Sequence, residues 1–62
     1  MKRIKVLLWL YVGHEKGENF VWIQALVGYV YYGSRAEFYN DPLMKQFLDH
    51  PLYLIEIQEE NV

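Results

Sequence analysis

The chain of 62 residues contains no cysteine and no threonine, and Ser34 is its only serine. Without cysteine there is neither a disulfide framework nor a thiolate that could act as nucleophile or metal ligand. The single serine stands where a helix cap is expected, so an arrangement of serine, histidine and an acid for catalysis is not expected. The absence of cysteine also fits a reducing, cytosolic compartment. These absences favour a binding function over catalysis.

Basic residues are few, and no apolar run is long enough to span a membrane. The chain has 6 Lys and Arg against 8 Asp and Glu, a formal net charge of -2, whereas a nucleic-acid-binding surface is usually basic. Residues 6–12 follow a basic start as in a signal peptide, but no small-residue cleavage site comes after them. This run is also far shorter than the roughly 20 residues of a membrane-spanning helix. We therefore expect a soluble intracellular protein without direct contact to nucleic acid or membrane.

Hydrophobic and aromatic side chains are abundant, at 53% and 18% of the residues. A domain of this size buries only about 60% of the surface of its unfolded chain, so a stable core needs such a composition. Two segments, residues 3–12 and 20–32, have apolar side chains at both odd and even positions. Because successive side chains in a strand point to opposite faces, both segments predict strands that are apolar on both faces.

Polar and turn-forming residues divide the chain into a β-β-α-β order. The glycine-bracketed run of residues 13–19 predicts a hairpin loop that is longer than a two-residue turn. Ser34 and Glu37 have the spacing of a capping box, which predicts the start of a helix. Residues 52–58 predict a third strand, and the acidic residues 59–62 predict a frayed tail.

Two prolines define the predicted helix. Apolar residues recur at helical spacing over residues 36–48. Pro42 lies inside this range, which predicts either a kink or a second helix start capped by Asn40 or Asp41. Pro51 disfavours the helical conformation of the residue before it, so the helix should end there.

The element order restricts the topology of the sheet. A right-handed crossover through the helix sets the third strand parallel to the second and beside the first. We therefore predict one small α+β domain over residues 1–62, with a three-stranded antiparallel sheet of order 2-1-3 and one helix packed on one face. The aliphatic residues expected beneath the helix are Ile4, Val6, Leu8, Leu10, Val21, Ile23, Ala25 and Val27. The residues expected on the uncovered face are Leu7, Trp9, Tyr11, Trp22, Leu26 and Val30.

The uncovered face is unusually apolar for a soluble monomer. Its side chains would expose on the order of 500 to 800 Å², against roughly 300 to 600 Å² for the largest patch of a typical monomer. A standard interface buries about 800 Å² per partner, and Trp and Tyr often dominate its binding energy. A protein partner explains this face. The alternatives are that the aromatic residues enlarge a small core, that a loop covers them, or that the chain forms a homodimer through the sheet.

Few residues are suited to catalysis or to metal binding. His14, His50 and Lys45 are residue types of acid-base ribonucleases, but histidines in a loop and at a helix end are usually only solvated. A metal site that adds Glu15 and Asp49 to the histidines has no ligand spacing to support it. We therefore expect no enzymatic activity, no cofactor and no metal.

Acidic residues line the predicted helix and the end of the chain. They are Glu37, Asp41 and Asp49 on the helix, and Glu56, Glu59 and Glu60 near the end. The simplest interpretation is a solvated surface. Alternatively, these carboxylates steer the protein toward a basic groove such as the RNA site of a nuclease. A small acidic protein with an aromatic surface is suited to nuclease inhibition.

Three stretches of the sequence resemble a family of phage proteins. They are Ile4-Lys5-Val6-Leu7-Leu8 with the aromatic Tyr11, the aromatic end of the second strand at Tyr31, and the run Asn40-x-x-Leu43-x-Lys45-x-Phe47-Leu48-Asp49. In these features the chain resembles the Dmd antitoxins of T-even-like bacteriophages, which have the same size. The similarity extends in register over nearly the whole chain.

The resemblance implies a small sheet with one helix and a non-enzymatic inhibitor. Its partner would be a host ribonuclease toxin of the RnlA or LsoA type, which cleaves messenger RNA in the cytoplasm of the infected bacterium. The inhibitor would occlude the active-site groove of the toxin, with acidic side chains in place of phosphates. Tyr31 and Asn40 match positions where the family places an aromatic residue and an asparagine. The candidate contact residues are Tyr31, Tyr32, Asn40, Trp9, Trp22, Glu37 and Asp41.

Two other functions remain open. The same surface could serve an inhibitor or adaptor of a different host protein. A small RNA-binding or RNA-cleaving protein could instead stack bases on its aromatic residues and use its histidines. Binding to RNA that weakens with salt, in the absence of any protein partner, would indicate this last function.

Overall fold

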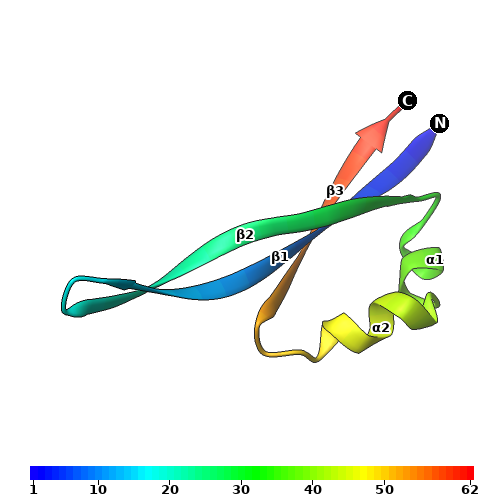
Figure 1. Cartoon of the computed structure of the whole chain (residues 1–62). Helices are drawn as coiled ribbons and strands as arrows, with labels where there is room; N and C mark the ends of the chain where they lie inside the picture. Colours follow the sequence, from blue (N-terminus) through cyan, green and yellow to red (C-terminus); the bar gives the residue numbers. More distant parts are fainter.

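The computed structural model describes residues 1–62 and contains three strands and two short helices (Figure 1). The elements are β1 (Lys2–Lys16), β2 (Asn19–Tyr32), α1 (Arg35–Tyr39), α2 (Pro42–Leu48) and β3 (Tyr53–Asn61). The strands pair antiparallel in the order β2-β1-β3. The predicted α+β class and strand order are thereby confirmed.

The hairpin of β1 and β2 is longer than the sequence predicted. Pairing continues until Lys16 lies opposite Asn19, so only Gly17 and Glu18 form the turn. The predicted long loop over residues 13–19 is therefore wrong. Gly17 has a φ of 64°, and a positive φ at the first central residue is what a tight type II′ hairpin turn requires. The polar residues that suggested a loop belong to the solvent-exposed ends of the two strands.

β3 includes residues 59–61 of the acidic end, which was predicted to be frayed. Glu59 and Glu60 continue the ladder opposite the basic start of β1. The Arg3 Nε donates to Glu60 Oε2 at 3.1 Å, and the Arg35 guanidinium donates to Glu59 Oε1 at 3.2 Å. The prediction of a frayed tail is wrong because opposite charges on β1 and α1 hold these carboxylates beside the sheet.

The helical segment is divided in two at Pro42. A kink and a second helix start were both expected at Pro42, and the structure has the second helix start. Asp41 Oδ1 caps α2 by accepting the Leu43 N–H at 3.0 Å, and Pro42 lies in the first turn of α2. Ser34 caps α1 by accepting the Glu37 N–H at 3.3 Å. The Glu37 carboxylate accepts the Gly33 N–H at 2.7 Å, so the predicted cap is present with its return bond one residue earlier.

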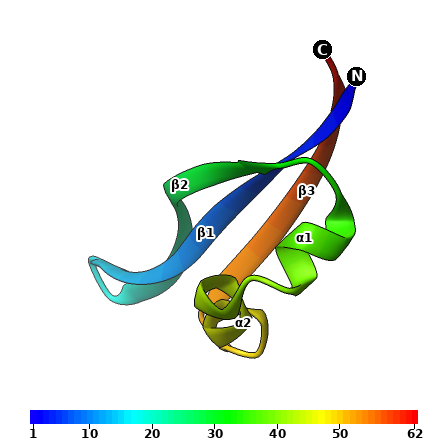
Figure 2. The same cartoon turned by 90° about the vertical axis from the view of Figure 1, so that its right-hand side faces the viewer.

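The two helices cover only one end of one sheet face (Figures 1 and 2). The core cluster consists of Ile4, Val6, Phe38 and Met44, with the partly buried Tyr32, Phe47, Ile55 and Ile57 packed against it. In the whole chain 5 of 62 residues are buried. The prediction that Ile4 and Val6 lie beneath the helices is confirmed. Val21 and Ile23 are exposed, because the helices end before reaching the far part of the hairpin.

A β-bulge in β2 changes which side chains share a face. Between Leu8 and Trp9 of β1 the partner in β2 moves from Gly28 to Leu26, so Val27 is an extra residue in its strand. The two-residue alternation of β2 is therefore out of phase on the two sides of the bulge.

Because of this bulge, part of the predicted assignment of β2 residues to the two faces is wrong. Val30 was predicted on the uncovered face, but it lies opposite Val6 on the helical side. Val27 was predicted beneath the helix, but it is the bulged residue and is exposed. Tyr31 points to the uncovered face, since it lies opposite Lys5 in the ladder.

The molecule is elongated along the hairpin. Its extents are 50 × 24 × 11 Å and its radius of gyration is 14.4 Å, against about 10.6 Å for a compact domain of this length. Its accessible surface is 4839 Å², against about 4,250 Å² for a typical monomer of this mass. The excess surface lies where the hairpin extends beyond β3 and the helices (Figure 1).

Candidate protein-binding surface

The hairpin beyond the end of β3 forms a free two-stranded arm, residues 12–23. The last pairing of β1 with β3 joins Leu10 and Tyr53, and the last bond runs from the Tyr11 N–H to the Leu52 carbonyl at 2.8 Å. The arm therefore has neither a third strand nor a helix against it (Figure 1). Its exposed apolar residues, between 38% and 60% accessible, are Val12, Phe20, Val21, Trp22 and Ile23.

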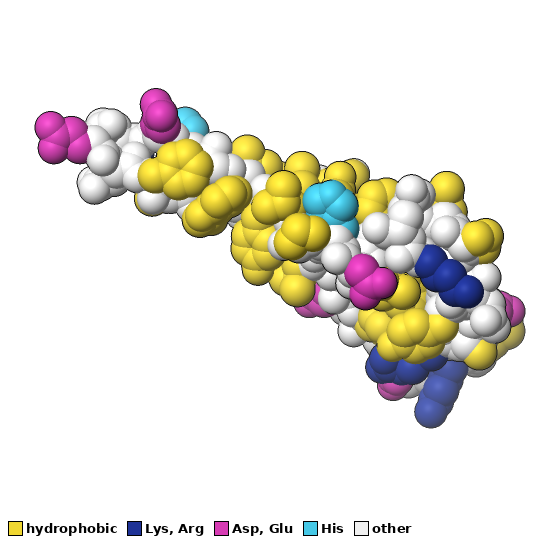
Figure 3. Space-filling model, turned by 90° about the horizontal axis from the view of Figure 1, so that it is seen from below, with side chains coloured by type: hydrophobic (Ala, Val, Ile, Leu, Met, Phe, Trp, Pro, Cys, Tyr) yellow, Lys and Arg dark blue, Asp and Glu magenta, His cyan; other side chains and the backbone are white.

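The open face is the side of the sheet that no helix covers. The ladder registers place on it Leu7, Trp9 and Tyr11 of β1, and Phe20, Trp22, Gln24, Leu26, Tyr29 and Tyr31 of β2. Leu7 is buried yet does not belong to the core cluster beneath the helices. The β1–β2 ladder continues from this face into the arm, so the arm and the open face form one extended apolar surface. Figure 3, seen from the side on which the helices lie, shows hydrophobic side chains on the arm and over the middle of the molecule.

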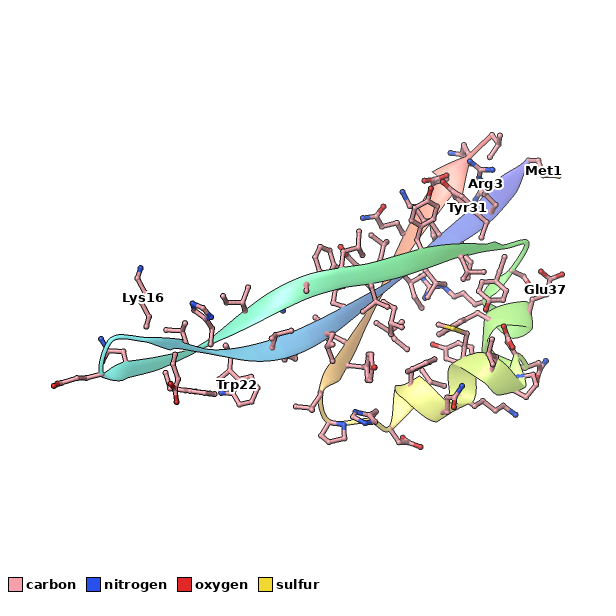
Figure 4. The ribbon with its side chains drawn as sticks, viewed as in Figure 1. Met1, Arg3, Lys16, Trp22, Tyr31 and Glu37 are labelled. Carbon is pink, nitrogen blue, oxygen red and sulfur yellow. The ribbon has the colours of Figure 1, made fainter.

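Basic and aromatic side chains meet at the base of the open face. The Arg3 guanidinium lies 4.1 Å from the ring centre of Tyr31, and Lys5 Nζ lies 4.4 Å from that of Tyr29. The two tyrosine rings pack edge to face at 5.6 Å. Figure 4 shows Arg3 and Tyr31 next to each other. Sequence reasoning missed this cluster, although strand alternation alone places Arg3 and Lys5 on the face of Leu7.

The two tryptophans of the open face have different surroundings. Trp9 is partly buried, and its Nε1–H donates to Glu56 Oε2 at 3.1 Å. Trp22 is 60% exposed and packs edge to face on Phe20 at 5.3 Å. Figure 4 places Trp22 on the arm, away from the helices. Trp22 and Phe20 are therefore available to a partner, whereas Trp9 supports the sheet.

Tyr32 and Asp41 form a hydrogen bond that joins β2 to the start of α2. The Tyr32 hydroxyl donates to Asp41 Oδ2 at 2.5 Å, and its ring packs against Phe38. Burial, followed by this bond and the charge of Asp41, raises the pKa of Tyr32 from 10.0 to about 12. The same bond, with the Leu43 N–H, lowers the pKa of Asp41. Both side chains thus have a role in holding the fold.

The predicted contact residues are divided between two sides of the sheet. Tyr31, Trp9 and Trp22 share the open face. Glu37 and Asn40 belong to the helical layer, Glu37 in the cap of α1 and Asn40 as the exposed C-cap residue that follows this helix. The pair selected by the resemblance, Tyr31 and Asn40, is therefore not brought together on one face.

Most carboxylates of the chain bind groups within the chain. Glu56, Glu59 and Glu60 accept side-chain bonds from Trp9, Arg35 and Arg3, while Glu37 and Asp41 accept helix-cap bonds. Glu15, Glu18 and Asp49 make no such side-chain bond. Glu15 and Glu18 lie at the tip of the arm. The acidic groups available to a partner are thus concentrated at the tip.

The structure assembles no metal site from its histidines and carboxylates. No group of three or more His, Asp and Glu side chains could hold a metal ion. His14 lies in the arm, and His50 follows α2, where its Nδ1 accepts the Leu52 N–H at 3.2 Å. Neither helix has the length and apolar character needed to cross a bilayer.

A free apolar arm beside an aromatic sheet face defines the chain as a small α+β protein with a candidate protein-binding surface. No protein-family model, curated protein or solved structure matches it. The resemblance to the Dmd antitoxins therefore stays a prediction from the residues quoted above.

Proposed function

We propose that the protein is an inhibitor that inserts its arm into a groove of a partner protein. The supporting observation is the arm itself, a ribbon whose apolar side chains are 38% to 60% exposed and uncovered on both faces. Exposed apolar surface of this kind marks interaction sites, and Trp residues often dominate their binding energy. Because a two-stranded ribbon is one sheet layer thick, about 10 Å, the two walls of a groove can contact both faces at once.

The resemblance suggests the partner: a ribonuclease toxin of the RnlA or LsoA type, in the cytoplasm of a phage-infected bacterium. The protein then acts without catalysis, as an antitoxin that excludes messenger RNA from the active-site groove. Trp22 and Phe20 become buried between the groove walls. Glu15 and Glu18 at the tip of the arm face basic residues that otherwise bind phosphates. Tyr31 and Asn40 contact the rim of the groove from opposite sides of the sheet.

Bacterial growth during co-expression with an RnlA- or LsoA-type toxin tests this function. We expect the protein to restore growth and to co-purify with the toxin. Trp22→Ala should weaken both effects, because it removes the most exposed aromatic anchor of the arm. Leu43→Ala is the matched control, since Leu43 is a comparably exposed apolar residue on α2. A folded protein that neither rescues growth nor binds the toxin would reject this target.

An adaptor for another host protein and an RNA-binding protein are the competing functions. Capture of a different protein that requires Trp22 would favour the first. The second has less support, because Arg3 and Arg35 are already paired with Glu60 and Glu59. Salt-sensitive RNA binding by the isolated chain would nevertheless overturn the inhibitor proposal.

A further inference from the structure

β2 is an edge strand of the sheet and lacks the usual protection against further pairing. Its 14 residues, Asn19–Tyr32, include no charged residue and no proline. Soluble proteins usually protect a long edge strand with charges, proline or a covering element. The opposite edge of this sheet follows that rule, since β3 carries Glu56, Glu59 and Glu60. β2 is therefore suited to pair with another strand.

An apolar cleft lies beside this edge on the helical side of the sheet. It has a volume of about 180 Å³, and Leu8, Val30 and Met44 are among the residues that line it around Gly28. A Cβ atom added at Gly28 would meet no heavy atom within 4 Å. The space above Gly28 is thus open and lined by apolar side chains.

The same strand carries side chains that fit this cleft. Val21 and Ile23 point to the helical side of the arm, where nothing covers them. When two copies of β2 pair antiparallel about an axis perpendicular to the sheet, the helical sides of both copies face the same way. A register that sets Ile23 opposite Gly28 of the second copy also sets Val21 opposite Val30. The projecting side chains of Val21 and Ile23 and the cleft around Gly28 thus belong to the same strand. Each copy can therefore supply both complementary parts, as a two-fold interface requires.

We propose that two copies of this chain pair antiparallel through β2, with Ile23 of each copy in the cleft over Gly28 of the other. The three-stranded sheet is thereby doubled to the order β3-β1-β2-β2-β1-β3. Each arm lies beside the helix-covered base of the second copy. On the open face, Trp22 of one copy comes opposite Tyr29 of the other.

Charge and surface area favour a second copy as the occupant of this edge. Because β2 has no charged residue, pairing it with itself brings no like charges together. The accessible surface of 4839 Å² exceeds that of a typical monomer by about 600 Å². This excess belongs to the elongated hairpin, whose β2 edge and apolar side chains a single chain leaves uncovered.

Sedimentation equilibrium of the purified chain tests the dimer. We expect twice the 7.5 kDa of one chain at micromolar concentration. Ile23→Lys places a charge in the cleft and should yield the monomer. Val12→Lys is the matched control and should stay dimeric, since Val12 is the similarly exposed cross-strand neighbour of Ile23 on the inner strand. Circular dichroism establishes that both variants are folded.

Disulfide trapping tests the register, because the chain has no cysteine of its own. Ile23→Cys and Gly28→Cys in one chain lie about 16 Å apart along the strand, too far for a bond within the chain. In the dimer they lie opposite each other, so oxidation should give a covalent dimer. Val12→Cys with Gly28→Cys should give none.

Two results would overturn the proposal. One is a chain that remains monomeric at all concentrations tested. The other is a dimer that tolerates Ile23→Lys and is not trapped by the paired cysteines, which would mean that the two copies associate through a surface other than β2. All these measurements use the isolated chain and are therefore independent of the toxin.

Discussion

Trp9 and Trp22 lie on the same face of the sheet but differ in what surrounds them. Trp9 sits in the central strand beside β3 and donates to Glu56. Trp22 lies on the arm, where Phe20 is the aromatic side chain packed against it. The indole that is packed stabilises the fold, and the indole that is exposed remains available for binding.

Replacing each tryptophan with alanine should separate these roles. Trp22→Ala should change the free energy of unfolding by less than about 1 kcal/mol, because little packing is lost at an exposed site. Trp9→Ala should cost about 2 kcal/mol, somewhat less than a fully buried aromatic residue. Urea unfolding measures both values, and calorimetry with the proposed toxin partner measures the effect of each change on binding. A larger stability loss for Trp22→Ala than for Trp9→Ala would contradict the free arm.

The Tyr32–Asp41 hydrogen bond should make stability depend on pH at both extremes. The pKa of Asp41 is lowered from 3.8, so its contribution is present above that value and is lost as acid protonates the folded-state carboxylate. The pKa of Tyr32 is raised from 10.0 to about 12, so its contribution is present below pH 10 and is lost as the pH rises toward 12. Denaturant midpoints measured across the pH range should fall at both ends.

Tyr32→Phe is the control for this pH dependence. The variant keeps the ring against Phe38 but removes the hydroxyl that donates to Asp41. Its stability should fall less steeply between pH 10 and 12 than that of the wild type, for which the pKa of Tyr32 is about 12. An ultraviolet titration of the 6 tyrosines should lose its last step in the variant. An unchanged titration would assign the raised pKa to another tyrosine.

Among the elements, the hairpin turn depends on a single backbone conformation. Gly17 has a φ of 64°, where a residue with a side chain is strained by about 1 kcal/mol. Gly17→Ala should therefore lower the free energy of unfolding by about this amount, whereas Glu18→Ala should have little effect. Thermal unfolding of both variants checks this expectation. Equal stability of the two variants would show that the turn does not set the register.

The bulge at Val27 determines which aromatic residues share a face. Phe20 and Trp22 have even numbers, whereas Tyr29 and Tyr31 have odd numbers, yet all four lie on the open face. A regular strand would place these two pairs on opposite faces. The sequence contains Gly28 next to the bulge, but glycine in a strand does not specify where the extra residue is. Strand existence and order were therefore predictable, and the face of each residue in β2 was not.

Strand pairing extends further than the sequence predicted at two places, the turn of the β1–β2 hairpin and the C-terminal end of β3. Gly13 and the polar residues after it suggested a loop, since composition alone does not distinguish an exposed strand end from a turn. Glu59 and Glu60 suggested a tail, because their partners Arg3 and Arg35 are distant in sequence. Within the candidate site, the two-residue alternation of the sequence identified Trp9 and Trp22. The boundary between the free arm and the part of the sheet beneath the helices depends on where the helices end.

For the molecule as a whole, the arm and the base should differ in local stability. The base includes the buried Ile4 and Val6 beneath the helices, whereas residues 12–23 have pairing between β1 and β2 alone. At concentrations where the chain is monomeric, backbone amides of residues 12–23 should exchange with solvent faster than those of residues 4–8. Hydrogen exchange followed by mass spectrometry measures this difference. Uniform protection would indicate that the monomer folds back over its arm.

Because the arm touches neither helix nor β3, its length can vary without affecting the base. Two residues inserted in each strand extend the reach by about 7 Å and keep every side chain on its face, whereas one residue in each reverses the faces. Under the proposed function, a graded series of hairpins, lengthened or shortened in such steps, would therefore measure the depth of the partner's groove. Inhibition should then be strongest for the hairpin whose tip just reaches the floor of the groove.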